Sequence, residues 1–499
     1  MVAQVMSQTQ NAGQITTAHF GGRFADLAIE LDCLFDDEDA RLRLFALQHQ
    51  SCGRTGKRTT DDYDVIVDSH DNQDNALGAV QRQLYLGAGG ISLGSVLPRN
   101  ARSCGRSAGI QRWTLQTMIF RNARLIFPDG VRDGFELVVH GEEIAEIRQQ
   151  TETRGEDVVD LHGNYLAPGF IDLHVHGALG RDTMEASVEA FRAVCDFHAS
   201  GGTTSLLLTT STAALDKIVN VLRAVGDCRL EIRAIAGVHV EGPFISKAKV
   251  GAQRAEFIQN PASAAVQQLL EHADAIRRVT IAPEIPGALK AIEDFHANGI
   301  NVSGGHSDAW DEDARAAFDR GMRSVTHTFN CMSSARRRGV CRVAGLLEFA
   351  LGEPQISCEL IADGHHVSST LMKMLYRAKG PRGICLVTDA TAGAGLSDGS
   401  RFALNGRECI VDGGVCLLGD GSALAGSAAR MIDLIRTMVT KVDVPLYEAV
   451  AMASQNPAHA IGLERKGELN IGADADFVVL SPQLQVLRTF VSGEQVWSD

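Results

Sequence analysis

The chain has 499 residues, of which 45% are hydrophobic and 22% charged, proportions typical of a globular protein with a large buried core. Its formal net charge of −14 argues against a nucleic-acid-binding surface, because phosphate backbones are held by basic patches. The 11 cysteines include no CxxC pair and no apolar run is long enough to cross a bilayer. We therefore expect a cytoplasmic protein with reduced thiols and with neither nucleic acid nor a membrane as partner.

Residues 1–117 carry few signals. Segments such as Asp71–Asn75 are polar and aperiodic, and only Phe24–Gln50 has a helical spacing of apolar residues. We expect residues 1–117 to be a poorly ordered extension of unknown role, or the product of a translation start placed upstream of Met118, where globular patterning begins.

Strand patterns occupy both flanks of the remaining chain. Met118–Ile126, Phe135–His140 and Gly141–Ile147 predict a small β meander, and strand patterns return over Asp476–Leu480 and Gln485–Trp497. We expect residues 118–164 and 465–499 to form one small β-sandwich domain. The β-patterned segment 401–418, which interrupts the last helical crossover, is also placed with these strands.

Strands and helices alternate from residue 165 to residue 464. Eight apolar segments are predicted as buried strands, beginning with the one at Phe170 and continuing with Thr203–Thr210, Ile232–Glu241, Arg278–Pro283, Ile300–His306, Ser324–Asn330, Gln355–Asp363 and Gly383–Asp389. Segments of helical spacing, such as Val188–Ser200 and Ala213–Val225, lie between them. These alternations predict an α/β protein with a TIM (β/α)8 barrel, in which chemistry gathers at the carboxyl ends of the strands.

Two histidines end the first of these strands. Leu166–Gly177 is a short apolar strand bounded by Pro-Gly and Gly, and His174 and His176 face the same side because side chains alternate along a strand. Neutral imidazoles suit zinc and similar divalent ions. A His-x-His pair also arises by chance in a chain with 16 histidines, so its weight depends on the other strand ends.

Further residues with ligand chemistry fall at the ends of strands 3, 5, 6 and 8: Glu241, His306, His327 and Asp389. Each has a structural alternative, since a glutamate can form an ion pair and an aspartate can cap a helix. Burying so many polar groups unpaired at one end of a barrel would be costly. We therefore predict one or two divalent ions held by His174, His176, Glu241, His306 and His327, with Asp389 taking a proton from water.

From Met118 to the C-terminus the chain resembles the N-acetylglucosamine-6-phosphate deacetylases, a branch of the amidohydrolase superfamily. The matching motifs are Pro168–Gly177, Gly202–Thr210, His239–Phe244, Gly305–Ser307, His327–Met332, Ala362–Val367, Leu386–Ala392 and Leu424–Ser427. The resemblance implies a metal-dependent hydrolase of amino-sugar catabolism that converts N-acetyl-D-glucosamine 6-phosphate to D-glucosamine 6-phosphate and acetate. It also implies zinc or iron as the metal and a homodimer.

The resemblance assigns roles to individual residues. Glu241, His306 and His327 match the metal ligands found throughout the family, whereas His174 and His176 match members that carry a second ion. Asp389 matches the catalytic proton carrier. The implied sugar-phosphate contacts are Ala252, Gln253, Asn330, Cys331, His366, Leu424, Ala425 and Gly426, together with Arg336 or Arg338.

Two departures from the family pattern bear on these roles. Gln253 stands where the family usually has a histidine thought to polarise the acetyl carbonyl; glutamine can donate a hydrogen bond but cannot titrate. Arg336–Gly339 replaces the family's Arg-Glu-Pro-Gly. Spacing from His327 favours Arg338 as the phosphate ligand, whereas alignment on Gly339 supports Arg336.

Three rival functions remain in view. N-acetylgalactosamine-6-phosphate deacetylation cannot be separated from the glucosamine reaction by sequence. Ring-opening amidohydrolases such as dihydroorotases often use a carbamylated lysine on strand 4, and Val279–Glu284 contains none. A catalytically inactive barrel acting as a binding scaffold would be expected to lose metal ligands or the strand-8 aspartate, and all are present here.

Overall fold

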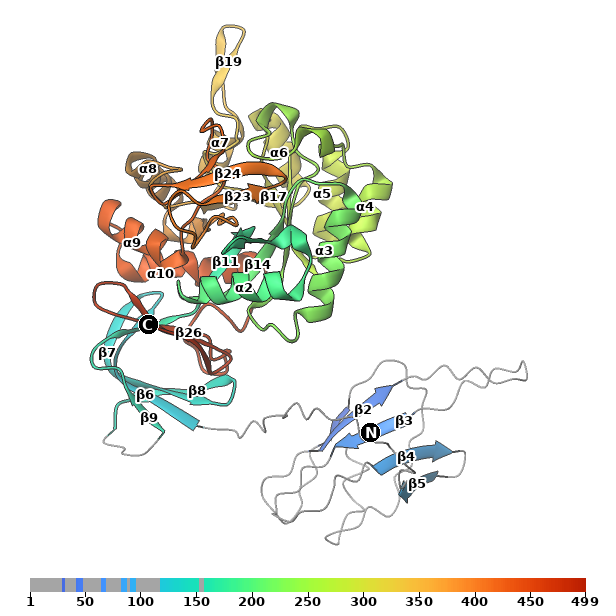
Figure 1. The fold of residues 1–499 in the computed structure, drawn as a ribbon, viewed down its shortest axis with the longest axis vertical. Helices are drawn as coiled ribbons and strands as arrows, with labels where there is room; N and C mark the ends of the chain where they lie inside the picture. Colours follow the sequence, from blue (N-terminus) through green and yellow to red (C-terminus); the bar gives the residue numbers. More distant parts are fainter. Residues whose placement is uncertain are drawn as a thin grey trace, which may run out of the picture. The chain divides into compact units, whose positions relative to one another are not determined.

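The structure is a computed structural model that describes residues 117–151 and 157–499 and, before them, the backbone of five strands. The chain divides into two units, Met1–Gln111 and Arg112–Asp499. In the first unit, β1 (Ile29–Leu31), β2 (Leu42–Leu47), β3 (Asp64–Asp68), β4 (Arg82–Gly87) and β5 (Gly90–Ser95) form one antiparallel sheet in sequence order (Figure 1). β1 and β2 lie within residues 24–50, so the helical spacing of apolar residues noted there does not correspond to a helix at these strands. The expectation of a poorly ordered extension otherwise concerns residues outside the described part of the chain.

The two flanks of the second unit share one mixed sheet of eight strands, in the order β28-β27-β26-β10-β6-β7-β8 with β9 paired to β6. Its strands are β6 (Thr117–Phe127), β7 (Gly130–His140), β8 (Glu143–Gln149), β9 (Val158–Asp160), β10 (Tyr165–Pro168), β26 (Phe477–Leu480), β27 (Val486–Val491) and β28 (Glu494–Ser498). β10 joins the halves, parallel to β6 and antiparallel to β26. Phe120 packs edge-on against Phe477 and Phe490 from the other flank, so both flanks contribute to one core.

The barrel consists of eight parallel strands in chain order. They are β11 (Phe170–Val175), β14 (Thr203–Thr210), β15 (Ile235–Glu241), β16 (Ile276–Ile281), β17 (Asn301–Gly304), β18 (Met322–Val325), β21 (Ser357–Leu360) and β22 (Ile384–Leu386). Residues just after β22 close the barrel against β11, because the N–H of Asp389 donates to the carbonyl of His174 at 2.9 Å and Val175 pairs with Ala390. The predicted TIM barrel is confirmed.

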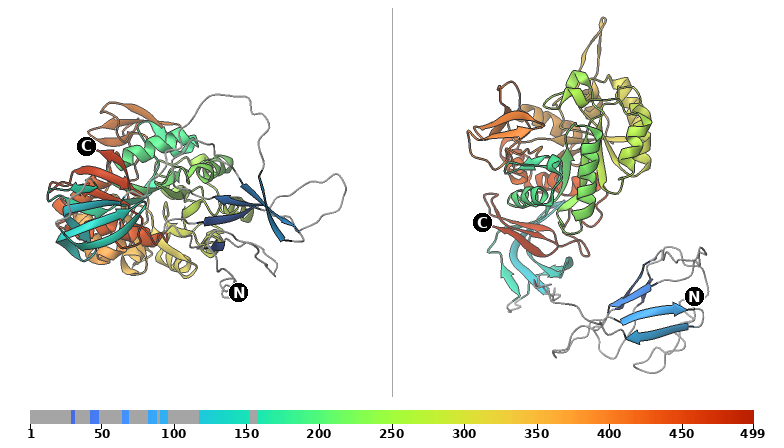
Figure 2. Two further views of the ribbon diagram at one scale, coloured as in Figure 1. Left: turned by 90° about the horizontal axis from the view of Figure 1, so that it is seen from below. Right: turned by 45° about the vertical axis from the view of Figure 1, so that its right-hand side comes forward.

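Helices cover the outside of the barrel (Figures 1 and 2): α2 (Val188–Ala199), α3 (Leu215–Cys228), α4 (Ser263–Leu270), α5 (Ala288–Ala297), α6 (Asp311–Asp319), α7 (Leu346–Gly352), α8 (Ser369–Lys379), α9 (Met431–Lys441), α10 (Leu446–Ala453) and α11 (Gln455–Ala460). In α3, Ile218, Leu222 and Val225 recur at helical spacing and are fully buried against the strands. The Ser187 hydroxyl caps α2 by accepting a hydrogen bond from the N–H of Ala190. In the described residues, no helix is both long and apolar enough for a membrane span.

Short elements decorate the barrel. They are the hairpins β12 (Gly177–Ala178) with β13 (Arg181–Asp182) and β19 (Arg336–Arg338) with β20 (Cys341–Val343), and the 3-10 turns Thr183–Glu185, Lys247–Lys249, Ala255–Phe257 and Pro381–Gly383. The β19–β20 hairpin projects away from the barrel in Figure 1.

The segment 401–418 forms a sheet of its own, and its placement with the β domain is wrong. β23 (Arg401–Leu404), β24 (Arg407–Asp412) and β25 (Val415–Leu418) make a three-stranded antiparallel sheet. Its apolar face buries Phe402 and Cys416 against Ala392 and Ala425, which lie in the loops that follow β22. Because this sheet completes its core with barrel loops, its strands need no partner in the β domain.

Candidate metal centre

The barrel brings five predicted ligands to one end. His174 lies in β11 and Glu241 is the last residue of β15, whereas His176, His306 and His327 lie one or two residues beyond their strands. All five side chains are buried, with at most 4% of each residue exposed. Parallel strands place their carboxyl ends at the same barrel face, so residues far apart in sequence meet there.

Glu241 stands at the middle of these groups. Its Oε1 lies 3.1 Å from His306 Nε2 and 3.2 Å from His327 Nε2, and its Oε2 lies 3.2 Å from His176 Nε2. His174 Nε2 is 3.6 Å from Oε1 of the same carboxylate. One buried carboxylate is therefore surrounded by four imidazoles.

The imidazole nitrogens also face one another. His306 Nε2 and His327 Nε2 are 3.1 Å apart, and His174 Nε2 and His176 Nε2 are 3.2 Å apart. Facing lone pairs of neutral imidazoles repel unless a proton or a metal ion lies between them. Nitrogen and carboxylate donors are those that zinc and similar ions prefer, so this donor set fits one ion at Glu241, His306 and His327 and another at His174, His176 and Glu241.

The outer nitrogens of these rings are also engaged. His306 Nδ1 lies 2.8 Å from the carbonyl of Lys249, and His327 Nδ1 lies 3.1 Å from the carbonyl of Asn330. His176 Nδ1 lies 3.4 Å from a serine hydroxyl, and His174 Nδ1 lies 3.3 Å from a Glu359 carboxylate oxygen. A ring that donates from Nδ1 keeps the Nε2 lone pair available for a metal ion.

The charges of the centre favour a cation. Burial acts to lower the pKa of His174, but the carboxylates of Asp389 and Glu241 raise this pKa well above its ordinary value. Burial acts to raise the pKa of Glu241, yet His174 and the hydrogen bonds from the surrounding histidines lower it well below the ordinary range. The carboxylates therefore favour positive charge at the centre, either as a proton on histidine or as a metal ion.

Asp389 follows β22 and faces the histidine pair. Its Oδ1 is 3.4 Å from both His174 Nε2 and His176 Nε2, and the side chain is 14% exposed. This is the position from which a carboxylate can exchange a proton with water at the centre and with a bound substrate.

The backbone is strained around these side chains. Asp389, His306 and His327 have φ values of 49°, 45° and 30°, in the left-handed region that side-chain-bearing residues rarely adopt. Such conformations cost about 1–3 kcal/mol each and persist only where the surrounding structure enforces them. Gly426 is required beside Asp389, because a Cβ there would lie 2.6 Å from the Asp389 carbonyl oxygen.

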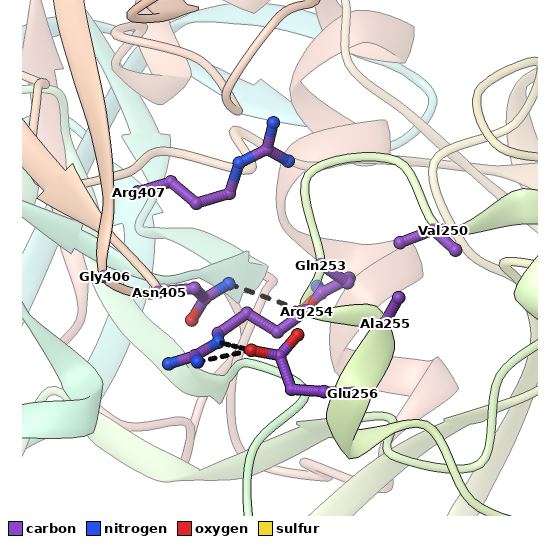
Figure 3. Close-up of a pocket in the computed structure, with 8 residues that line it drawn as sticks. All are labelled: Val250, Gln253, Arg254, Ala255, Glu256, Asn405, Gly406 and Arg407. Atoms are coloured by element: carbon purple, nitrogen blue, oxygen red, sulfur yellow. Dashed lines mark hydrogen bonds and ion pairs between the residues drawn. The ribbon is translucent and has the colours of Figure 1, made fainter.

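Gln253 lies against the metal ligands. Its Nε2 donates to Glu241 Oε2 at 2.5 Å, and its Oε1 accepts from the N–H of Thr212 at 2.8 Å. Gln253 lines a pocket of about 380 Å³ that lies between the loop after β15 and the turn at Asn405. Figure 3 shows these lining residues, and Asn405 Nδ2 lies 3.5 Å from Gln253 Oε1. Both polar ends of Gln253 are therefore engaged within the protein.

The other predicted sugar contacts surround the same end of the barrel. Asn330 and Cys331 follow His327. Burial acts to lower the pKa of His306, but its hydrogen bonds with Cys331 and Glu241 raise this pKa well above its ordinary value. Ala252 packs against the core of the β23–β25 sheet. The loop Leu424–Gly426 is joined to the strand-8 end, since the Ala425 carbonyl accepts from the Thr391 hydroxyl at 3.0 Å.

Two predicted phosphate-binding groups have partners within the chain. Arg336 pairs with Asp308 and Arg338 with Glu312, and both guanidinium groups stack on the Trp310 ring, 4.1 and 4.0 Å from its centroid. These two arginines of β19 therefore contact Trp310, the residue that precedes α6.

His366, the third predicted phosphate-binding group, lies after β21. Burial acts to lower the pKa of His366, but the Asp363 carboxylate, 2.7 Å from Nδ1, raises this pKa above its ordinary value, and Asp389 adds to the effect.

Sequence reasoning missed a second group of polar residues behind the metal centre. Arg278 in β16 and Glu359 in β21 are each 1% exposed, and Asp172 in β11 is fully buried. Burial acts to raise the pKa of Glu359, but Arg278 and His174 lower it to about 2. The available signal was a charged residue at a core position of a predicted strand, which requires a buried partner.

Comparison with known proteins identifies close relatives. The model of the Amidohydrolase family matches residues 165–496. The N-acetylglucosamine-6-phosphate deacetylase of Lysinibacillus sphaericus is 34% identical over 382 residues, which cover 76% of this chain and 97% of the relative. That of Homo sapiens is 36% identical over 352 residues, 68% of this chain and 85% of the relative.

Solved structures of N-acetylglucosamine-6-phosphate deacetylases have a similar fold. The crystal structure of N-acetylglucosamine-6-phosphate deacetylase from Pasteurella multocida superimposes with a TM-score of 0.73 at 32% identity, covering 77% of this chain and all of the other. The Mycobacterium smegmatis enzyme in complex with N-acetyl-D-glucosamine-6-phosphate gives a TM-score of 0.72 at 28% identity, again over 77% of this chain and all of the other.

Proposed function

The chain belongs to the amidohydrolase family and to its N-acetylglucosamine-6-phosphate deacetylase branch, and on this premise we propose the reaction that it performs. It hydrolyses N-acetyl-D-glucosamine 6-phosphate to D-glucosamine 6-phosphate and acetate, a step of amino-sugar catabolism. The observation that carries the proposal is the convergence of Glu241, the two histidine pairs and Asp389 at one end of the barrel.

The proposed reaction requires a divalent metal ion, which we propose to be zinc or iron. Glu241, His306 and His327 would hold one ion, and His174 and His176 would share Glu241 with a second. When bound, such an ion lowers the pKa of water from 15.7 toward about 7 and withdraws electrons from a carbonyl oxygen. The remaining steps fall to the side chains of this chain.

Asp389 carries the proton. It accepts the proton of the attacking water as the oxygen–carbon bond to the acetyl group forms, and it returns a proton to the sugar nitrogen as the carbon–nitrogen bond breaks. Its Oδ1 lies 3.4 Å from Nε2 of both His174 and His176, and its side chain is 14% exposed, which supports a role at the attacking water and at the substrate. Without that returned proton, the amine would have to leave as an unstable anion.

The substrate's phosphate supplies a second point of attachment. His366, held by Asp363, and one of Arg336 and Arg338 are our proposed phosphate ligands. Arginine matches phosphate oxygens bidentately, which favours it in this role. We further propose that the protein acts as a cytoplasmic homodimer.

Acetate release from a panel of N-acetyl sugars tests the function. The full chain, supplied with zinc or iron(II), should hydrolyse N-acetyl-D-glucosamine 6-phosphate far faster than unphosphorylated N-acetyl-D-glucosamine. The 4-epimer, N-acetyl-D-galactosamine 6-phosphate, is the alternative substrate and decides between the two sugar configurations. No acetate from any member of the panel would support the inactive scaffold instead.

A further inference from the structure

A buried ion pair lies next to the metal centre. Arg278 Nη2 is 2.9 Å from Glu359 Oε1, and each side chain is only 1% exposed. The two residues belong to β16 and β21, which are not neighbours in the sheet, so the pair crosses the barrel interior. Removing charges from water costs several kcal/mol per ion, so a buried pair adds little stability by itself and requires another explanation.

Glu359 contacts two of the candidate metal ligands through its other oxygen. Oε2 is 3.3 Å from His174 Nδ1 and accepts a hydrogen bond from the backbone N–H of His327 at 3.1 Å. When His174 donates from Nδ1, its Nε2 keeps a free lone pair, and Nε2 is the atom that faces Glu241 and Asp389. The carboxylate thus selects the tautomer and the ring orientation that a metal ligand needs.

The same residues allow a different interpretation, in which His174, His239 and Glu359 hold a cation of their own. Donor atoms of the three lie within 4.8 Å of one another. The Arg278 guanidinium argues against this, because it already supplies the positive charge at Glu359 and is itself fixed by Ser303 Oγ at 2.9 Å. A metal ion beside a fixed guanidinium would be strongly repelled in the protein interior.

His174 depends on a side chain more than the ligands of the first ion do. His306 donates from Nδ1 to the backbone carbonyl of Lys249 at 2.8 Å, and His327 donates from Nδ1 to the backbone carbonyl of Asn330 at 3.1 Å. Substituting a side chain leaves those acceptors in place. Loss of the Glu359 carboxylate therefore releases the His174 ring and removes an acceptor from the backbone N–H of His327, while the carbonyls that orient the rings of His306 and His327 stay in place.

We propose that Glu359, held by Arg278, is a positioning residue that turns His174 toward the metal centre and so builds the site of a second ion. This inference rests on the metal centre of the proposed function. It concerns how the second ion is held and leaves the identity of the substrate untouched.

Metal titration of the full chain tests the proposal without relying on turnover. Protein freed of metal by a chelator is titrated with zinc, and bound metal is counted by elemental analysis. Glu359→Gln keeps the side-chain volume but removes the charge and one acceptor oxygen. It should weaken binding of the second ion about 10–100-fold and leave the first ion unchanged. His174→Asn should lose the same ion.

Glu353→Gln is the matched control, because Glu353 forms an Arg–Glu pair with Arg315 at 3.0 Å that touches no candidate ligand. It should bind both ions as wild type does. A folded Glu359→Gln protein that binds the second ion with wild-type affinity overturns the proposal.

A second variant covers the possibility that Glu359→Gln does not fold. Arg278→Met combined with Glu359→Met removes the pair without leaving a lone buried charge, and such replacements are often neutral for stability. It should fold, keep the first ion and lose the second. Retention of both ions, or failure of this variant to fold as well, would show that the pair serves the fold and would overturn the proposal. Wild-type protein with a single ion would also overturn it, whereas wild-type protein with no ion would overturn the proposed function instead.

Discussion

The side-chain amide of Gln253 donates a hydrogen bond to Glu241 Oε2 at 2.5 Å, so a residue expected to contact the substrate contacts a candidate metal ligand. Its Oε1 accepts from the backbone N–H of Thr212, and neither end is left free. The histidine that the family resemblance implies at this position could titrate, whereas glutamine can only hold Glu241 in place.

Gln253→Ala should therefore weaken metal binding more than substrate binding. Losing an outer partner of a metal ligand typically costs about 10–100-fold in metal affinity, and we expect that loss at the ions that share Glu241. Zinc titration and the Michaelis constant at saturating zinc measure the two effects. Asn405→Ala, which removes only a 3.5 Å contact to Gln253, serves as the control. A raised Michaelis constant with unchanged metal affinity would restore the substrate role.

Metal content should depend unequally on the two histidine pairs. His306→Ala removes a ligand of the ion held by Glu241 and His327, so it should abolish activity and lower the bound metal. His174→Ala should remove at most the second ion. Elemental analysis of each purified variant, together with chelation of the wild type, checks both expectations. A metal-free protein with full activity would contradict the assignment.

Asp389→Asn should keep the fold and the metal but lose turnover. Asparagine can neither accept the proton of water nor protonate the leaving amine. General acid–base help is worth roughly 10²–10⁴-fold, and we expect kcat to fall by at least that factor. Steady-state kinetics and metal content are measured on the same sample. A substantial residual rate would move the proton transfer elsewhere, with His365 and His366 as the next candidates.

One of the two arginines stacked on Trp310 should set the preference for a phosphorylated sugar. A charge-assisted hydrogen bond is worth about 1.5–3 kcal/mol, so losing the true ligand should lower kcat/KM for the 6-phosphate by one to two orders of magnitude. Arg336→Ala and Arg338→Ala should then differ, one erasing the preference and the other nearly silent. Arg337→Ala is the control, because side chains alternate along β19 and Arg337 faces the other way. Equal hydrolysis of phosphorylated and plain sugars by the wild type would exclude the phosphate site.

Stability should fall in acid through His198, a fully buried residue of α2. Burial lowers the pKa of His198 from 6.5 to about 4. Between pH 4 and pH 6.5 the unfolded chain therefore binds a proton at His198 that the folded chain excludes. The contribution of neutral His198 to the unfolding free energy is complete above pH 6.5 and disappears as the pH falls through 4. The pKa difference corresponds to at most about 3 kcal/mol.

His198→Gln should accordingly flatten the rise of the unfolding free energy between pH 4 and pH 6.5. Denaturant unfolding at several pH values measures the unfolding free energy of the variant and of the wild type. The difference between the two cancels the contribution from titration of the metal centre, which both proteins share. His162→Gln, at a site with an 80% exposed side chain, is the control. An unchanged slope in His198→Gln would show that the buried ring does not titrate in this range.

The barrel could be predicted because its signals are local. β14 has the predicted bounds Thr203–Thr210, and β15 begins at Ile235, three residues after the predicted start. Alternation over two residues marks strands, a period near 3.6 marks helices, and eight repeats leave few other folds. The same periodicity places His174 and His176 on one face, which is why the metal centre could be proposed from the sequence alone.

The partners of buried polar groups could not be predicted in this way. Arg278 and Glu359 meet across the barrel only because β16 and β21 close into one sheet, and nothing in either local sequence specifies the other. The β23–β25 sheet likewise depends on packing against loops beyond its own strands.

The sequence by itself determined the elements, their order and the end of the barrel where ligand-type side chains gather, because these follow from period and chain direction. The tertiary structure alone decided which atoms those side chains contact. It placed Gln253 on Glu241 and Glu359 on His174, since a hydrogen bond between distant residues depends on strand register and side-chain packing to within about 0.5 Å.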